Sequence, residues 1–194
     1  MKALVLSLAL ALTGIAHAQH GGGAGAAAAA PAEAAQFDFL VGQWELEVTP
    51  KVSGLAAMIH GAPKLVGSWK AWKAFDGHGL DDELRIVDAS GNPRSLSYSQ
   101  RIFDAKTQRW LVSGLDVYRA RFGSSSGQWQ GGEMRLEGSG LTNDGKPMLT
   151  RTRFMEITAE RFKMRQDRSY DNGANWEEGT LTVVAKRVSR KAAR

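Results

Sequence analysis

The sequence predicts an all-β fold in which about ten short antiparallel strands enclose one core, as either a barrel or a sandwich. From Trp44 onward apolar side chains alternate with polar ones, as in Trp44, Leu46 and Val48, and this period places every second side chain on one face. Turn-forming residues recur at short intervals, among them Asp76-Gly77 and Asn143-Asp144-Gly145. No repeat of roughly 20 to 50 residues is visible, so neither a solenoid nor a propeller is expected.

The first 18 residues have the features of a secretory signal peptide. Lys2 precedes an apolar stretch, residues 3–15, which is shorter than the roughly 20 residues that span a bilayer. Ala16-His17-Ala18 then supplies the small residues that signal peptidase recognises. We therefore expect cleavage after Ala18, a periplasmic or secreted location, and no stable membrane insertion of the mature chain.

Composition divides the mature chain into three parts. Residues 19–35 are rich in glycine and alanine, which predicts a flexible tether before a folded domain at residues 36–188. Residues 189–194 form a basic tail, which is either a solvated terminus or a segment weakly attracted to an anionic membrane surface. Residues 36–185 include 19 basic and 19 acidic side chains. The domain is therefore neutral, and a nucleic-acid partner is not expected.

Cysteine and histidine content limits the chemistry of the chain. There is no cysteine, which excludes disulfides, thiolate metal sites and cysteine nucleophiles. After export only His20, His60 and His78 remain, and they lack the close pairing that zinc sites use. The acidic run Asp81-Asp82-Glu83 lies beside a turn, and adjacent residues on a strand face opposite sides. We therefore expect no metal, no cofactor and no pair of catalytic carboxylates.

Two later segments alternate as clearly as the first strand. In residues 95–104 the side chains assigned to the inner face are Leu96, Tyr98, Gln100 and Ile102. In residues 161–167 they are Phe162, Met164 and Gln166. One segment breaks the rhythm: residues 51–63 are apolar and end at a proline, so they form either a helical turn over the barrel mouth or an ordered loop.

The start of the domain carries a family resemblance. Phe37, Phe39 and Leu40 precede Gly42-Gln43-Trp44, where glycine permits a tight entry into the first strand and Trp44 plugs one end. This G-x-W arrangement resembles the calycins, the lipocalin-like barrels. More closely, the chain resembles an uncharacterised family of secreted or periplasmic bacterial proteins with the same Phe-Leu-x-Gly-x-Trp start.

Other short motifs follow in the order that this family has. They are Phe75-Asp76-Gly77, residues 101–110, and residues 151–164 running into residues 169–176. The likeness covers about residues 36–188, although the 51–63 insertion is longer than the family usually has. It implies a single calycin-like barrel rather than a sandwich, and it brings no established activity.

Residues 169–176 also fit a local turn motif, S-x-D-x-G-x-x-W, which resembles the Asp-box of sialidase propellers. We interpret the single copy as a hairpin lock. Ser169 and Asp171 are expected to accept hydrogen bonds from turn amides, Gly173 to adopt positive φ, and Trp176 to cover the base.

Polar side chains on the predicted inner face indicate an interior that is not wholly apolar. Buried polar groups need partners, and small barrels can hold a ligand inside. The candidate interior ligand contacts are Tyr98, Gln100, Tyr118, Arg153, Met164 and Gln166. Threonines 150, 152, 180 and 182 belong to the same inner-facing set.

Three functions remain open at this stage. The first is an exported barrel that binds a small, mostly apolar ligand, such as a lipid or an aromatic metabolite. The alternative is a non-catalytic interaction module with a solid core. The third is a cavity isomerase or cyclase, for which Arg153, Tyr98 and Tyr118 are the first suspects. No catalytic motif is present, and the oligomeric state is not predicted.

Overall fold

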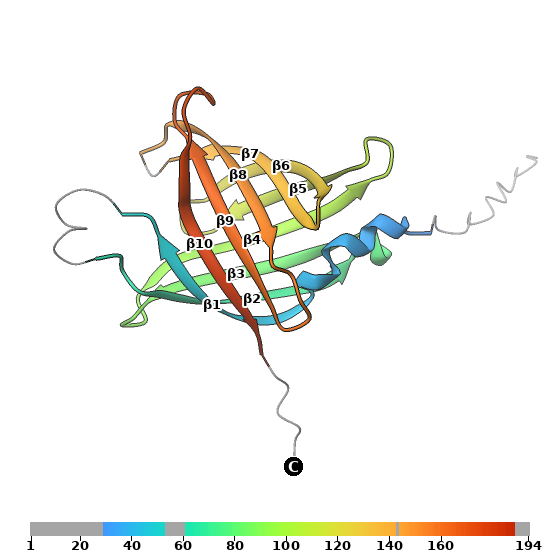
Figure 1. Ribbon diagram of the computed structural model, residues 1–194, viewed down its shortest axis with the longest axis horizontal. Coiled ribbons are helices and arrows are strands. Elements are labelled where there is room, and N and C mark those ends of the chain that lie inside the picture. Colours follow the sequence, from blue (N-terminus) through green and yellow to red (C-terminus); the bar gives the residue numbers. More distant parts are fainter. Residues whose placement is uncertain (1–28, 53–60, 143, 189–194) are drawn as a thin grey trace, which may run out of the picture.

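The computed structural model describes residues 29–52, 61–142 and 144–188, and in this part the chain forms a closed barrel of ten antiparallel strands (Figure 1). Each strand pairs with its neighbours in sequence, and β1 closes the barrel by pairing with β10. The prediction of an all-β antiparallel barrel is therefore confirmed. The predicted signal peptide and basic tail, and most of the 51–63 insertion, lie outside the described residues.

The strands are connected in a simple up-and-down order, with a 3-10 helix, η1 (Ala32–Leu40), before the first strand and a 3-10 turn, η2 (Phe75–Gly77), after the second. The strands are β1 (Gly42–Pro50), β2 (Leu65–Ala74), β3 (Gly79–Asp88), β4 (Pro93–Asp104), β5 (Arg109–Asp116), β6 (Arg121–Gln130), β7 (Glu133–Leu141), β8 (Pro147–Met155), β9 (Arg161–Ser169) and β10 (Glu177–Arg187).

One end of the barrel is filled by η1 (Figure 1). Phe37 is fully buried, and its ring meets Trp110 edge-on with centroids 4.8 Å apart. Gln36 Oε1 accepts a hydrogen bond from the Trp110 indole, at 3.0 Å. Residues 32–35 were expected to belong to the tether but lie in this helix, with Ala34 buried. The aromatic residues after this short alanine segment are buried, and their burial holds the segment in the helix. Composition alone did not indicate this.

Trp44 closes the same end with help from the last strand. Its indole donates to Leu40 O at 2.8 Å, and the Arg187 guanidinium lies 4.1 Å from the centre of its ring. Arg187 Nη1 also donates to Val41 O at 2.9 Å. Gly42 has φ of +126°, and a Cβ there would stand 2.5 Å from Arg187 Nη1. Glycine is therefore favoured at this position by its dihedral angle, and a larger residue would also displace the Arg187 guanidinium from its contacts.

The predicted inner face is correct for β1 and β9 and wrong for β4. Trp44, Leu46 and Val48 are buried, as are Phe162 and Met164. On β4, however, the buried side chains are Arg101 and Phe103, whereas Ile102 is 42% exposed. Serines 95, 97 and 99 share the inner face with them, so this strand carries Leu96 and Ile102 outside, and small hydroxyls together with Arg101 and Phe103 inside.

Candidate functional site

The interior of the barrel is not packed solid. A cavity of about 250 Å³ lies within it, lined by residues from every strand between β2 and β10. Seven of the lining residues are apolar and seven are serine or threonine. The lining is thus of mixed polarity, like the inner face that the sequence predicted. Asp82 and Arg101 are the charged residues among those that line it.

A buried ion pair forms part of the cavity wall. Arg101 Nε donates to Asp82 Oδ2 at 2.6 Å, and the Trp69 indole donates to Asp82 Oδ1 at 2.8 Å. The Asp82 and Arg101 side chains are only 1% and 6% exposed. Both carboxylate oxygens therefore have a donor, which offsets part of the free energy of removing the charges from water.

The guanidinium of Arg101 has unused donors. It carries five N–H groups, and only Nε donates to another described residue. Among the described residues, the one buried side-chain N or O atom with no partner is Asp81 Oδ1, so the terminal nitrogens of Arg101 are not sealed off from open space. Phe37 covers the guanidinium, with Cζ 5.1 Å from the ring centre, and Arg101 itself lines the cavity. Arg101 therefore lines the cavity with terminal nitrogens that have no partner among the described residues.

Two of the six predicted ligand contacts line this cavity and four do not. Met164 and Gln166 lie on its wall. Tyr98 is on the outer face of β4, where its hydroxyl donates to Asp81 Oδ2 at 2.6 Å. That hydrogen bond, with burial and the Asp81 charge, raises the pKa of Tyr98 to about 12. The inward placement expected for Tyr98 is therefore wrong.

The other three side chains also lie away from the interior. Gln100 faces outward on β4, Tyr118 is in the exposed turn between β5 and β6, and Arg153 is on the outer face of β8. For Gln100 the reason is the reversed face of β4. Tyr118 was assigned to an inner face, but the strand ends at Asp116. The three residues suspected of catalysis, Arg153, Tyr98 and Tyr118, are thus all absent from the cavity lining.

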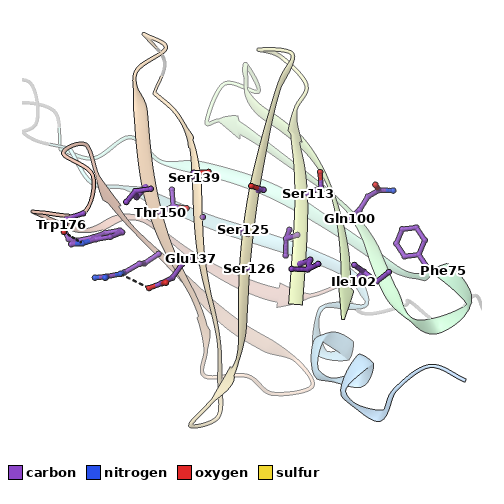
Figure 2. A pocket seen from close by; sticks show the side chains of 17 residues that line it. Phe75, Gln100, Ile102, Ser113, Ser125, Ser126, Glu137, Ser139, Thr150 and Trp176 are labelled. Atoms are coloured by element: carbon purple, nitrogen blue, oxygen red, sulfur yellow. Dashed lines mark hydrogen bonds and ion pairs between the residues drawn. The ribbon is translucent and has the colours of Figure 1, made fainter. Parts of the chain in front are cut away.

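A larger groove of about 920 Å³ runs over the outer face of β4 to β8 (Figure 2). Figure 2 shows Phe75 at one end, Trp176 at the other and serine side chains such as Ser113 between them. Ile102 and Leu111 expose apolar surface in it. The groove and the interior cavity share lining residues in β5 to β8, so a single layer of sheet with small side chains separates them.

The turn between β9 and β10 builds the Trp176 end of the groove. Asp171 Oδ1 accepts from the Asn175 amide at 2.9 Å, Ser169 Oγ accepts from the Gly173 amide at 2.8 Å, and Gly173 has φ of +91°. The Arg151 guanidinium lies 3.9 Å from the centre of the Trp176 ring. The turn therefore holds the indole in a fixed place beside the sheet.

A third depression, of about 490 Å³, contains arginines on the outer faces of β7, β8 and β9. Arg135, Arg153 and Arg165 are direct neighbours across these strands. Arg135 pairs with Glu133, and Arg165 pairs with Asp167 and Glu178. These acidic partners largely neutralise the cluster.

Sequence reasoning missed the residues that give the cavity its character. Asp82 and Arg101 are 19 positions apart on neighbouring strands. Each lies in a segment with many other polar residues, so its charge gave no sign that the side chain is buried. The cavity serines on β4 appeared as the solvent side of an alternating strand. The small volume of these side chains could have indicated the cavity, because three serines at every second position cannot fill a barrel interior.

Two further observations concern metals and membranes. In residues 29–52, 61–142 and 144–188, no group of three or more histidine, aspartate or glutamate side chains is arranged to hold a metal ion. The helices of this same part of the chain are too short or too polar to cross a membrane.

Comparisons with known proteins place the fold. No protein-family model matches the sequence, and no curated protein matches it. Among solved structures, the S-type phycobiliprotein lyase CPES from Guillardia theta is 8% identical, with a TM-score of 0.50 over 80% of this chain and 92% of that one. A redesigned β-barrel, mFAP0, bound to DFHBI, is 9% identical, with a TM-score of 0.40 over 77% of this chain and 99% of that one. At such identities the likeness to the lyase is one of fold alone, a closed antiparallel barrel.

Proposed function

We propose that this protein binds one small ligand in the barrel interior. The observation that carries the proposal is the cavity of about 250 Å³ with the unused donors of Arg101 on its wall. Buried donors need an acceptor, and a cavity with apolar walls and a few fixed polar groups is the usual form of a ligand site. Without ligand, a few ordered waters serve as acceptors, and the ligand displaces them.

Cavity filling tests the proposal with a matched control on the other side of the sheet. Ser99→Leu places a larger side chain in the cavity, whereas Ser113→Leu places the same side chain in the outer groove. Wild-type protein and both variants are purified from the natural host and compared by native mass spectrometry. We expect a bound small molecule with the wild type and with Ser113→Leu, and its loss with Ser99→Leu.

A folded Ser99→Leu variant that retains the molecule would contradict interior binding, and so would wild-type protein that carries nothing and binds no added small molecule. The outer groove is the second candidate, favoured by the apolar surface that Phe75, Ile102 and Leu111 expose there. If the molecule is lost with Ser113→Leu and kept with Ser99→Leu, the outer groove is the binding site.

We also propose that the chain is exported, as the features of its first 18 residues predict, and that it belongs to the uncharacterised family of exported barrels that it resembles. The mature protein then begins at Gln19. Mass spectrometry of protein recovered from outside the cytoplasm of the host measures its N-terminus directly. Recovery of the chain only from the cytoplasm, with residues 1–18 still attached, would contradict the proposal of export.

A further inference from the structure

The charge of the cavity restricts the chemistry of its ligand. Arg101 and Asp82 are the charged residues that line it, and they form an ion pair with each other. Nearby, the inward-facing Arg168 donates to Gln166 and is not part of the lining. The net charge of the cavity wall is therefore zero, although the wall still offers N–H donors from Arg101.

A ligand carboxylate and a ligand carbonyl differ sharply in such a cavity. Either oxygen accepts the Arg101 donors, but a carboxylate adds a second negative charge beside Asp82 with one guanidinium between them. Removing an uncompensated charge even partly from water is unfavourable, whereas a neutral acceptor adds no charge. Arg101 donors bond a carboxylate more strongly than a neutral carbonyl, so the carbonyl is favoured only because the second negative charge beside Asp82 costs more than those stronger bonds return.

We infer that the interior ligand meets Arg101 through a neutral acceptor, such as a ketone, ester or amide carbonyl, and that the cavity rejects carboxylates of the same shape. This inference rests on the proposed function. It deepens that function by naming the class of group that the cavity recognises. The cavity has a volume of about 250 Å³, so the ligand is a small molecule.

Matched probes separate the two groups in the wild-type protein. Heptan-2-one and hexanoate have the same number of non-hydrogen atoms, as do acetophenone and benzoate, because a methyl group replaces one oxygen. Affinities are measured by calorimetry at neutral pH, where both acids are ionised. We expect each ketone to bind at least tenfold more tightly than its carboxylate. Equal or tighter binding of the carboxylate would overturn the inference while leaving interior binding in place.

The molecule recovered from the host gives an independent answer. A molecule without a free carboxylate, lost from the Ser99→Leu variant, supports both proposals. A carboxylic acid that is lost from the same variant supports interior binding and overturns the neutral-acceptor inference. If no molecule is recovered and no probe binds, the proposed function fails and the inference fails with it.

A charge change in the wall supplies the strongest test. Asp82→Asn keeps the shape of the side chain but leaves the Arg101 charge uncompensated, so hexanoate should bind at least tenfold more tightly than to the wild type. Asp81→Asn is the matched control, because the neighbouring carboxylate lies on the outer face and bonds Tyr98. It should leave the preference unchanged. Circular dichroism with hexanoate present shows whether Asp82→Asn folds.

If a folded Asp82→Asn variant prefers the ketone over the carboxylate as strongly as the wild type does, the ion pair does not set the preference of the cavity. If that variant does not fold, the wild-type probe pairs still decide the inference. A shift in preference with Asp81→Asn as large as that with Asp82→Asn would also count against it, because the effect would then come from overall charge and not from the cavity wall.

Discussion

At the residue scale, Arg101 and Asp82 depend on each other for burial. Replacing Arg101 with methionine leaves the Asp82 carboxylate inside the barrel with the Trp69 indole as its remaining side-chain donor. Loss of one partner of a buried pair typically costs about 3–5 kcal/mol. We expect Arg101→Met to lower the free energy of unfolding by that amount, measured by urea denaturation.

The double variant Asp82→Asn/Arg101→Met removes both charges, so it should lose less stability than Arg101→Met alone. A double variant that is less stable than the single one would contradict this expectation, because it would show that the Asp82 charge does not destabilise the barrel once Arg101 is gone. Comparing the stabilities of the single and double variants also measures how the charges of the cavity wall affect folding, because both side chains line the cavity.

Tyr98 gives a second prediction at this scale, in alkaline solution. Its pKa is raised from 10.0 to about 12, first by the hydrogen bond to Asp81. A raised pKa means that the linked stability is complete below pH 10 and is lost as pH rises toward 12. The difference in Tm between wild type and Tyr98→Phe should therefore be constant at neutral pH and shrink between pH 10 and 12. A constant difference across that range would contradict the Asp81 contact.

At the element scale, the turn between β9 and β10 has a pH dependence of opposite direction. The Asn175 amide, the Asn175 side chain and Ser169 lower the pKa of Asp171 from 3.8 to about 2. A lowered pKa means that the linked stability is present above pH 3.8 and is lost as pH falls toward 2. Wild type should therefore exceed Asp171→Asn in Tm at neutral pH, and the gap should close in that acid range.

Thermal melts followed by circular dichroism at several pH values test this. Asp144→Asn should show a gap that closes in the same direction, because hydrogen bonds from Thr142 and Lys146 lower the pKa of that carboxyl as well. A gap for Asp171→Asn that stays open at acid pH would contradict the assigned hydrogen bonds.

How well the sequence predicted each element depends on how that element buries its side chains. β1 and β9 were predicted correctly because apolar side chains alternate with charged ones, and charges without partners face water. β4 was assigned the wrong face because its charged residue has a buried partner on β3 and its serines line a space. A hydropathy pattern contains neither a partner on another strand nor an empty volume, so the cavity was foreseen only as an inner face of mixed polarity.

The start of the domain shows the same limit. Residues 32–35 have the composition of a tether, and their place in η1 follows from Phe37 and Leu40, which are buried at the barrel end. Tertiary packing thus determines this helix, whereas its own alanines give little indication.

At the scale of the whole molecule, closure of the barrel depends on the last strand. β10 pairs with β1 from Arg187 opposite Trp44 to Leu181 opposite Pro50, and it buries Val183 and Ala185. A chain that ends at residue 176 would leave β1 and β9 with unpaired edges and an open core. We expect it to lack a cooperative thermal transition, whereas a chain that ends at residue 188 should melt like the full chain.

The second chain removes only the basic tail and so controls for shortening. Cooperative melting of the chain that ends at residue 176, measured by circular dichroism, would show that nine strands suffice and that closure adds little.

The positions of the tryptophans allow ligand binding at either candidate site to be followed by intrinsic fluorescence. Of the six tryptophans, Trp69 lines the interior cavity and Trp176 lines the outer groove. Indole emission shifts in wavelength with the polarity of its surroundings, and Trp69 also donates to Asp82 beside the space that a ligand enters. Replacing one or the other with phenylalanine therefore assigns any change in fluorescence on titration to the inside or the outside of the barrel, without an attached dye.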